Sequence, residues 1–286
     1  MRLTGVGRRY GPVGPWVLRG VDLEVPAGAL LRISGANGSG KSTLLRLLAG
    51  IGAPSEGRIT GRPRTAYVPE RFPSALPFTA IGYLTHLGRV HGLPGPVAAD
   101  RATAWLARFG AEEHAGTQLR ELSKGTSQKV AVSQALLAEP ELLVLDEAWT
   151  GLDAEARAEL DLAVGELTST GARVVYVDHD PRRLAGTVDA AHRVEGTALV
   201  PDTTRPPEPA PQVTVLARAR AGTPLPAALP EGTHAEVDAA GTARFTVAAA
   251  HSDTLLRTLL HADPPWHVRA VREPVADANT PEDMRR

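Results

Sequence analysis

Residues 35–43, "GANGSGKST", combine glycines, a lysine and hydroxyl groups at a spacing suited to binding phosphate. Gly35, Gly40, Lys41 and Ser42 fill every fixed position of the pattern G-x-x-x-x-G-K-[ST]. Glycines let backbone N–H groups close around phosphate oxygens, and the start of a helix adds partial positive charge. Lys41 would reach the β and γ phosphates of a nucleotide, and Ser42 would offer its hydroxyl to Mg²⁺. The expected ATP contacts are Gly35, Asn37, Gly38, Ser39, Gly40, Lys41, Ser42 and Thr43.

The segments on either side of this stretch match the context that a P-loop requires. Residues 30–34, "LLRIS", have the composition of a buried strand, and residues 42–50, "STLLRLLAG", have that of a helix. The alternative is a glycine-rich turn that binds nothing. The strand and the helix argue against it, so the sequence predicts a nucleotide-binding P-loop.

Two adjacent acids, Asp146 and Glu147, follow the apolar residues 142–145, "LLVL". A buried strand that ends in acids places them at the carboxyl edge of a sheet, where ligands of open α/β sheets bind. Asp146 would hold Mg²⁺, and Glu147 would polarise the attacking water during ATP hydrolysis. Apolar strands end in two acids by chance often enough that this pair alone is weak evidence. Together with the P-loop it predicts an ATPase.

These groups need a scaffold, and the remaining sequence predicts an α/β one. Up to residue 200, strand-like apolar runs alternate with helical stretches, as in a parallel sheet covered by helices. Residues 201–212 are rich in proline and are expected to form a semi-rigid linker. Residues 213–272 are expected to form a small α+β module, and residues 273–286 a disordered tail.

Composition restricts the class of protein. With 286 residues, 43% hydrophobic and 22% charged, the chain fits about two globular domains. A net charge of −1 gives no electrostatic reason to expect nucleic acid as a direct partner. The absence of cysteine excludes disulfides and thiolate metal sites. Because no signal peptide and no long apolar run is visible, the chain is expected neither to span a membrane nor to be exported.

The separation between Lys41 and Asp146 exceeds what one helix and one strand need, so a subdomain must be inserted between them. Within that insertion, residues 122–126 read "LSKGT". With this stretch the chain resembles the ATP-binding cassette (ABC) family, whose signature Leu-Ser-Gly-Gly-Gln opens a helix ahead of the acidic pair. The resemblance covers residues 1–200 and implies a helical subdomain at about 72–135. It also implies that Tyr10 stacks on adenine, that Ser123, Gly125 and Asp153 contact nucleotide, and that His179 contacts the γ-phosphate.

Each of these family positions has a plainer alternative. Tyr10 could be an ordinary turn aromatic, and Trp16 is close enough to compete for the adenine. His179, between two aspartates, could be a solvated residue at a strand end. Asp153 could cap the helix that begins after it, because Asp is a favoured N-cap. The capping role and the nucleotide role of Asp153 are compatible.

The chain departs from the family pattern at several positions. Glu70 stands where most members have a glutamine that contacts Mg²⁺ and the membrane partner; it can still accept from metal-bound water but adds negative charge. Ala148 replaces a proline after the acidic pair. In the signature, Lys124 replaces a glycine and Thr126 a glutamine, whereas Ser123 and Gly125 are kept. The combination of Glu70 and Lys124 resembles the drug- and natural-product-exporter branch.

The resemblance also implies partners. A family signature completes the P-loop site of a second cassette, so one P-loop and one signature predict a homodimer or a pair with a related cassette. Closure of this dimer on ATP would drive transport through separate membrane-spanning permease subunits. The cassette would lie at the cytoplasmic face of the membrane. The alternatives are a non-transport ABC ATPase of translation or DNA maintenance, a P-loop kinase, and a catalytically silent cassette. The signature and His179 argue against a kinase, and the retained acids argue against a silent cassette.

Overall fold

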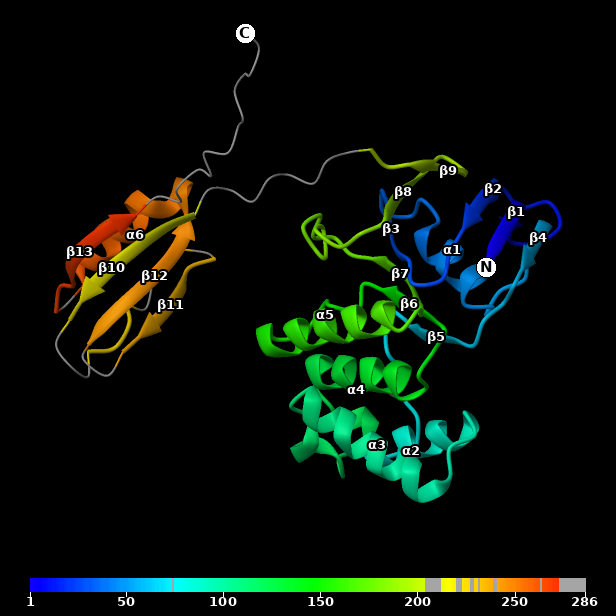
Figure 1. Ribbon diagram of the computed structural model, residues 1–286, viewed down its shortest axis with the longest axis horizontal. Helices are drawn as coiled ribbons and strands as arrows, with labels where there is room; N and C mark the ends of the chain where they lie inside the picture. The colour runs from blue at the N-terminus through cyan, green and yellow to red at the C-terminus, as the bar shows by residue number, and fades with distance from the viewer. Residues whose placement is uncertain are drawn as a thin grey trace, which may run out of the picture. The chain divides into compact units, whose positions relative to one another are not determined.

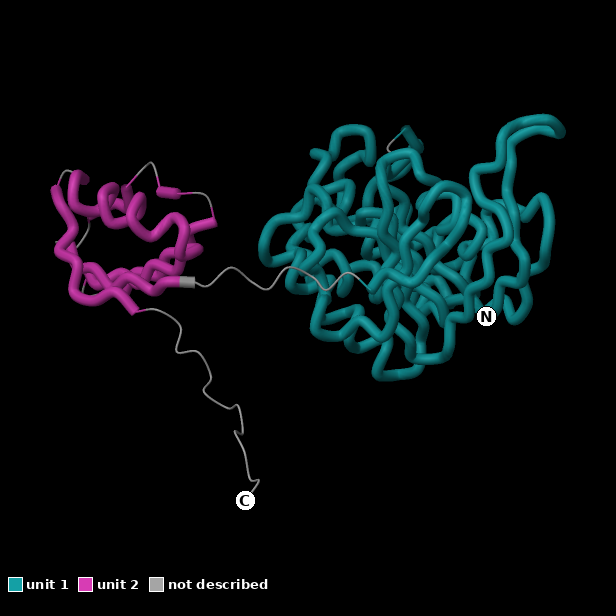
Figure 2. Tube along the Cα trace, turned by 90° about the horizontal axis from the view of Figure 1, so that it is seen from above, with its two compact units in different colours: residues 1–206 teal, residues 207–286 magenta. Residues whose placement is uncertain are grey.

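A computed structural model of the chain describes residues 1–73, 75–203, 212–219, 223–226, 229–230, 232–238, 241–262 and 264–272. The chain divides into two units, Met1–Pro206 and Pro207–Arg286 (Figure 2). Most of the predicted linker at 201–212, and all of the predicted tail at 273–286, lie outside the described residues. At the linker's margins, one strand ends at Pro201 and another begins at Gln212.

A six-stranded sheet with strand order β5-β6-β7-β3-β8-β9 forms the centre of the first unit. In that order the strands span Thr65–Val68, Leu142–Asp146, Arg173–Val177, Leu30–Gly35, Ala190–Glu195 and Ala198–Pro201. The strands from β5 to β8 run parallel, and β9 pairs antiparallel with β8. Parallel strands with both faces covered need apolar residues throughout, and every residue of β6 is buried. The predicted α/β fold is confirmed.

Helices cover both faces of this sheet (Figure 1). They are α1 (Lys41–Leu48), α4 (Lys124–Leu137) and α5 (Ala154–Ser169). Successive side chains of a strand point to opposite faces, so Leu142 and Val144 share a core with α1, whereas Leu143 and Leu145 share one with α4 and α5. Each fully buried Leu or Val contributes about 1.5–3 kcal/mol. These two cores fix the position of β6, and therefore of Asp146, relative to all three helices.

A three-stranded antiparallel sheet, β2-β1-β4, packs beside α1 and was not predicted from the sequence. Its strands are β1 (Arg2–Arg9), β2 (Trp16–Glu24) and β4 (Glu56–Thr60). Leu3, Val6 and Leu18 join the same core as α1. Register shifts interrupt the pairing of β1 with β2, and Gly5 and Gly20 have φ values of 56° and 63°. These irregularities break the alternation by which sequence patterns indicate strands.

Between β5 and β6 the chain forms a separate helical subdomain, as the fold prediction requires. It contains α2 (Ala80–Val90), α3 (Gly95–Arg108), two short 3₁₀ helices (Glu112–His114 and Leu119–Glu121) and α4. Tyr83, Leu84, Leu106 and Leu119 form its own core. This core is distinct from those of the sheet. It holds α2, α3 and α4 together, and so it fixes the position of the first turn of α4 within the subdomain.

The second unit is a four-stranded antiparallel sheet with one helix, which confirms the predicted α+β module. The strand order is β11-β12-β10-β13. The elements are β10 (Gln212–Arg218), β11 (His234–Val237), β12 (Thr242–Ala248), α6 (Ser252–His261) and β13 (His267–Arg272). Val215 and Phe245 pack with Leu255 and Leu259 of α6, and the rings of Phe245 and Trp266 meet edge to face at 5.6 Å.

Candidate active site

The P-loop lies between β3 and α1, at the carboxyl edge of the six-stranded sheet. Gly35, Gly38 and Gly40 have φ values of 144°, 76° and 106°. A Cβ atom on Gly35 would lie 2.8 Å from Ser39 Oγ and 2.9 Å from the carbonyl oxygen of Val194. Both the backbone conformation and the close packing therefore require glycine at Gly35.

Two side chains of this loop are suited to phosphate. Lys41 Nζ donates to the carbonyl oxygens of Gly35 at 2.9 Å and Ala36 at 3.0 Å, so its ammonium group folds over the loop. Ser39 Oγ is buried and, within the described residues, has no hydrogen-bond partner. An orphaned buried hydroxyl costs about 1–3 kcal/mol, which a phosphate oxygen would offset. Asn37 lies exposed at the tip of the turn. The loop therefore fits the phosphates of ATP.

Asp146 ends β6 with only 3% of its surface exposed. The hydroxyl of Ser42 donates to its Oδ1 at 3.3 Å, and the hydroxyl of Tyr67 donates to its Oδ2 at 3.0 Å. Burial raises the pKa of the Asp146 carboxyl above its usual value, and the nearby negative charge of Glu70 adds to the rise. Oxygen ligands of this kind suit Mg²⁺. The structure thus brings Ser42 and Asp146 together, with Glu70 close enough to influence them.

The residue after Asp146 contacts the predicted switch histidine. Glu147 Oε1 lies 2.8 Å from His179 Nε2. Glu147 has a φ of 55°, unusual for a residue with a side chain, and its backbone N–H donates to the carbonyl oxygen of Val177 at 3.0 Å. Strained backbone of this kind is concentrated at functional sites. The turn brings together the two residues that the sequence assigns to water activation and to the γ-phosphate.

Ser123 and Gly125 lie at the first turn of α4. Ser123 is the N-cap, and its Oγ accepts from the backbone N–H of Thr126 at 3.1 Å. A Cβ on Gly125 would lie 2.9 Å from the carbonyl oxygen of Gly151, so this position too requires glycine. In the described part of the chain, neither Ser123 nor Gly125 forms a hydrogen bond with the P-loop. The structure does not bring the signature to the P-loop of its own chain.

Asp153 caps α5, which is the plainer of its two predicted roles. Its Oδ1 accepts from the backbone N–H of Ala156 at 2.8 Å. Its Oδ2 lies 2.7 Å from Nζ of Lys129 on α4. The hydrogen bond from Lys129 lowers the pKa of Asp153, and the bond from Ala156 lowers it further. Asp153 therefore connects α5 to the signature helix, and this role leaves a nucleotide contact open.

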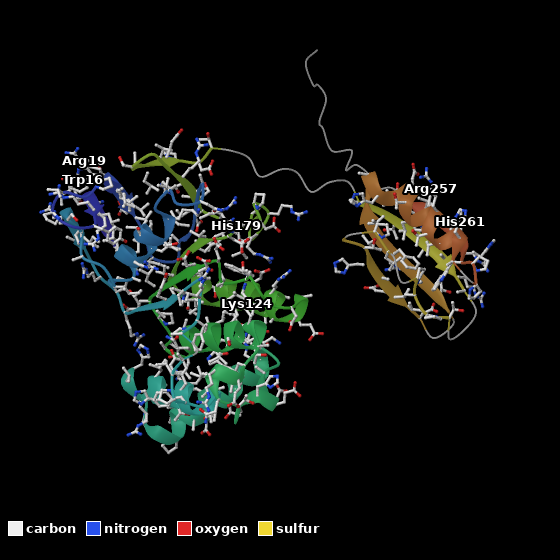
Figure 3. All side chains as sticks on the ribbon, turned by 180° about the vertical axis from the view of Figure 1, so that it is seen from behind. Trp16, Arg19, Lys124, His179, Arg257 and His261 are labelled. Atoms are coloured by element: carbon white, nitrogen blue, oxygen red, sulfur yellow. The ribbon has the colours of Figure 1, made fainter. Side chains whose placement is uncertain are left out.

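The two aromatic candidates for adenine stacking have different surroundings. The hydroxyl of Tyr10 lies 3.3 Å from Oγ1 of Thr43 in α1, and 54% of Tyr10 is exposed. The guanidinium groups of Arg9 and Arg19 contact the ring of Trp16, at 4.9 and 5.1 Å from its centroid. Trp16 and Arg19 lie side by side in Figure 3. Tyr10 is thus tied to the helix that carries the P-loop, whereas the Trp16 ring is engaged by arginines.

A cavity of about 460 Å³ brings together two of the departures from the family pattern, Glu70 and Lys124. It is lined by Glu70, Arg71, Phe72, Leu122, Lys124, Ser127, Gln128, Glu147 and Thr150. The aliphatic part of Lys124 lies beside Gly151, and the residue as a whole is exposed. Glu70, Lys124 and Glu147 of one chain therefore share one cavity. A larger cavity of about 550 Å³, which includes Arg64, Glu141 and Arg173, contains none of the predicted site residues.

Sequence reasoning missed the residues that hold the site residues in place. Asp161 accepts from Trp149 Nε1 at 2.8 Å and from Arg183 Nη1 at 2.9 Å, which joins the turn after Glu147 to the loop after His179. Tyr67 is half-buried, and burial raises its pKa to about 12, so its hydroxyl remains a donor. The sequence did carry one signal for Tyr67, which is a tyrosine within a short apolar strand. A buried tyrosine hydroxyl usually has a hydrogen-bond partner, so such a residue points to a polar group nearby.

Comparison with known proteins agrees with this geometry. A family model described as "ABC transporter" matches residues 18–150. The zinc import ATP-binding protein ZnuC of Cereibacter sphaeroides is 43% identical over 169 residues, which cover 57% of this chain and 67% of that protein. The aliphatic sulfonates import ATP-binding protein SsuB 1 of Mesorhizobium japonicum is 36% identical over 197 residues, which cover 66% of this chain and 72% of that protein.

The chain belongs to the family of ABC transporter ATP-binding subunits. It is therefore an ATP-binding cassette and an ATPase. A solved structure described as an ATP-binding subunit of an ABC transporter matches with a TM-score of 0.64 at 25% identity, covering 69% of this chain and 87% of that one. Relatives named for export also match: the macrolide export ATP-binding/permease protein MacB 1/2 of Paracoccus denitrificans is 33% identical over 214 residues, covering 68% of this chain and 31% of that protein.

No helix in the described part of the chain is both long and apolar enough to cross a bilayer. The described residues also contain no cluster of three or more His, Asp, Glu or Cys that would hold a metal ion without other ligands. Ser42 and Asp146 supply oxygen atoms side by side, so the remaining ligands of a magnesium ion would come from nucleotide and water.

Proposed function

We propose that this cassette hydrolyses ATP with Mg²⁺ in a closed dimer and thereby drives transport through separate membrane-spanning chains. The observation that supports it most is the contact of 2.8 Å between Glu147 and His179, one residue beyond the carboxylate that meets Ser42 of α1. This arrangement places a candidate base, a candidate γ-phosphate contact and a phosphate-binding loop at one edge of the sheet.

The P-loop edge would bind the nucleotide. Backbone N–H groups at the start of α1 and the ammonium group of Lys41 would hold the phosphates, with Lys41 exchanging its two carbonyl partners for phosphate oxygens. The orphaned hydroxyl of Ser39 would donate to a phosphate oxygen. Tyr10, joined to Thr43, would stack on the adenine. Ser42 and Asp146 would hold the magnesium ion, with Glu70 contacting it through a water molecule.

Hydrolysis would then depend on Glu147 and His179. Magnesium, when bound, neutralises charge that develops on the phosphates. Glu147 would accept a hydrogen bond from the attacking water and orient it towards the γ-phosphate. His179 Nε2, now 2.8 Å from Glu147 Oε1, would donate to a γ-phosphate oxygen in place of this contact, which leaves the Glu147 carboxylate to accept from the water. These residues act by position and charge, and no covalent intermediate is required.

A second cassette would complete the site. Ser123 and the backbone N–H of Gly125 lie at a helix start, which favours anions, yet among the described residues they form no hydrogen bond with the P-loop of their own chain. In a head-to-tail pair, the signature of each chain would contact the γ-phosphate on the other. ATP would favour the closed dimer because it binds both surfaces there.

Membrane-spanning partners would dock near Glu70, beside the cavity that it shares with Phe72, Lys124 and Glu147. We propose export as the direction of transport, on the basis of the Glu70 and Lys124 combination. Relatives named for import and for export both match, so sequence identity alone does not choose between the directions. Inside-out vesicles that contain the cassette and its membrane partner would accumulate cargo on addition of ATP if the direction is export.

We also propose that the two units are separate domains, with a boundary within residues 201–212 and a C-terminal domain at 213–272. Distinct hydrophobic cores support this division. Limited proteolysis tests this proposal, and first cleavage within residues 201–212 is the expected result.

The direct test of the catalytic proposal replaces Glu147 with glutamine. Because a positioned general base contributes about 10²–10⁴-fold, Glu147→Gln should lower the turnover number by at least about 10². The matched control is Glu112→Gln, which removes an exposed carboxylate of the helical subdomain. If Glu147→Gln hydrolyses ATP as fast as the wild type, the assignment of the base is wrong.

The same variant tests the dimer. Glu147→Gln should retain ATP, so in the presence of ATP and Mg²⁺ it should elute from a sizing column as a dimer. Without nucleotide it should elute as a monomer. A persistent monomer under both conditions would remove the case for a homodimer and leave a related cassette as the partner.

A further inference from the structure

We infer that Tyr67 is a positioning residue for Asp146, fixing the rotation of the carboxylate so that its Oδ1 faces Ser42. The inference rests on the proposed role of Asp146 in holding Mg²⁺. Tyr67 belongs neither to the P-loop nor to the signature, and in the described part of the chain its hydroxyl donates to Asp146.

The geometry of the sheet brings the tyrosine to this place. Strands β5 and β6 are parallel neighbours, with Tyr67 opposite Val144. The ring reaches along the sheet towards the end of β6, and its hydroxyl lies 3.0 Å from Asp146 Oδ2. Ser42 Oγ lies 3.3 Å from Oδ1. Each carboxylate oxygen thus has a different donor from a different element, so rotation of the carboxylate would break both hydrogen bonds.

The chemistry of the pair determines the direction of this hydrogen bond. The Tyr67 hydroxyl carries one proton, and an ionised carboxylate only accepts, so the hydroxyl donates to Asp146 Oδ2. Burial raises the pKa of Tyr67, which keeps that proton in place, and the positive charge of Arg46 on α1 opposes part of the rise. Because only 3% of Asp146 is exposed, solvent is a poor substitute for this donor. The hydrogen bond between Tyr67 and Asp146 therefore has one direction, with the tyrosine as the donor.

Fixing the carboxylate matters for metal binding. Groups that hydrogen-bond to a metal ligand orient it, and removing one typically costs about 10–100-fold in metal affinity or activity. Tyr67→Phe removes only the hydroxyl and keeps the ring, which packs against the core beside α1. The affinity for metal should fall within that range, whereas binding of ATP without metal, which depends on the P-loop, should not change.

The experiment uses the full chain and Mn²⁺ as a spectroscopic probe. ATP affinity is measured by calorimetry in EDTA, and Mn²⁺ affinity of the ATP-bound protein by electron paramagnetic resonance. The Tyr67→Phe variant should lose about 10–100-fold in Mn²⁺ affinity with ATP affinity in EDTA unchanged. Tyr83→Phe is the matched control, because it removes a tyrosine hydroxyl that donates to Gln134 Oε1 in the helical subdomain. It should change neither affinity.

Asp146→Asn separates this inference from the proposed function. If Asp146→Asn leaves Mn²⁺ affinity intact, the metal assignment itself fails and the inference with it. If Asp146→Asn weakens Mn²⁺ and Tyr67→Phe does not, only the inference fails. Equal losses of both affinities in Tyr67→Phe would show a structural role and also overturn it. In the double variant, a loss no larger than that of Asp146→Asn alone is expected, and additive losses would contradict action through Asp146.

Discussion

The two halves of the proposed nucleotide site differ in how their residues are held. At the P-loop edge, the functional side chains bond within their own chain. Lys41 donates to backbone carbonyls of the loop, Ser42 donates to Asp146, and Glu147 contacts His179. At the signature, the Ser123 hydroxyl bonds, within the residues that the structure describes, only to Thr126 of its own helix start. One half is organised by its own chain, whereas the other presents groups outward.

The two halves differ because their polar groups need different hydrogen-bond partners. Buried charged groups must be paired, so the P-loop edge carries a network even without nucleotide. An exposed helix start is satisfied by water and a capping side chain, so it needs no partner until an anion arrives. The first half should therefore be sensitive to single substitutions in its own chain, and the second should show its function only across two chains.

The largest expected effect comes from Lys41 in the self-organised half. Removing one preorganised donor to developing charge costs about 10²–10³-fold in turnover, so Lys41→Met should lose at least this much ATPase activity. Lys129→Met is the control, because it removes the same charge from α4 at a site bonded to Asp153. Steady-state release of phosphate measures both. If the two variants lose activity equally, the P-loop assignment of Lys41 is wrong.

The second prediction tests whether the signature works across chains. Ser123→Arg should block ATPase activity, because its bulk and charge occupy the helix start that would face phosphate. An equal mixture of Lys41→Met and Ser123→Arg should regain activity, because half of the dimers that form are mixed and hold one intact P-loop facing one intact signature. Neither variant alone has such a site.

The mixture distinguishes a signature that completes the P-loop site of the partner chain from one that completes the site of its own chain. If the signature served the P-loop of its own chain, each variant would carry one broken site and mixing would restore nothing. Matched thermal unfolding curves for the two variants would show that lost activity does not reflect lost structure. Activity in the mixture no greater than the mean of the two variants would contradict the proposed trans arrangement.

A smaller effect is expected from the aromatic residue of the first half. Stacking of a base on an aromatic ring is worth about 1–3 kcal/mol, so Tyr10→Ala should weaken ATP binding by roughly 5- to 100-fold. Trp16→Ala is the control, because its ring is engaged by Arg9 and Arg19. Fluorescence titration with ATP and with inorganic triphosphate separates the base from the phosphates. A larger loss in Trp16→Ala would reverse the assignment.

Much of the first half could be predicted because its chemistry depends on local spacing. The P-loop glycines, Asp146 and the buried strands follow from contiguous patterns, and the structure places these residues at one edge of the sheet. Tyr67 and Asp161 were missed because their partners lie on other elements. The register of β5 with β6 determines the first contact, and no short pattern reveals that register.

The sheet formed by β1, β2 and β4 shows a related limit. Its strands contain glycines with positive φ, and register shifts interrupt the pairing of β1 with β2. The alternation of apolar and polar residues that indicates a strand is therefore broken in these segments. The surroundings of Lys124 also could not be predicted from the sequence. Its place beside Gly151, in a cavity with Glu70 and Glu147, depends on how α4 packs against the turn after β6.

The smallest predicted effect concerns Asp153, which lies where the two halves meet. Loss of an N-cap costs about 0.5–2 kcal/mol, so Asp153→Ala should lower the free energy of unfolding of the first unit by that amount. Asp153→Asn keeps an oxygen that can cap α5 and loses only the charge that pairs with Lys129. It should cost less. Urea unfolding measures the free energy, and exchange of the Ala156 amide hydrogen reports the cap directly.

The pH dependence separates the cap from the ion pair. The pKa of Asp153 is lowered from its usual 3.8 in the folded protein, chiefly by Lys129. A lowered folded pKa gives stability that is present above the unfolded value and is lost as pH falls through the folded value. The stability advantage of wild type over Asp153→Asn should therefore be constant near neutral pH and shrink below about 3.8. A difference that did not change with acid would assign the whole contribution to hydrogen bonding, and α4 and α5 would then be joined by packing rather than by charge.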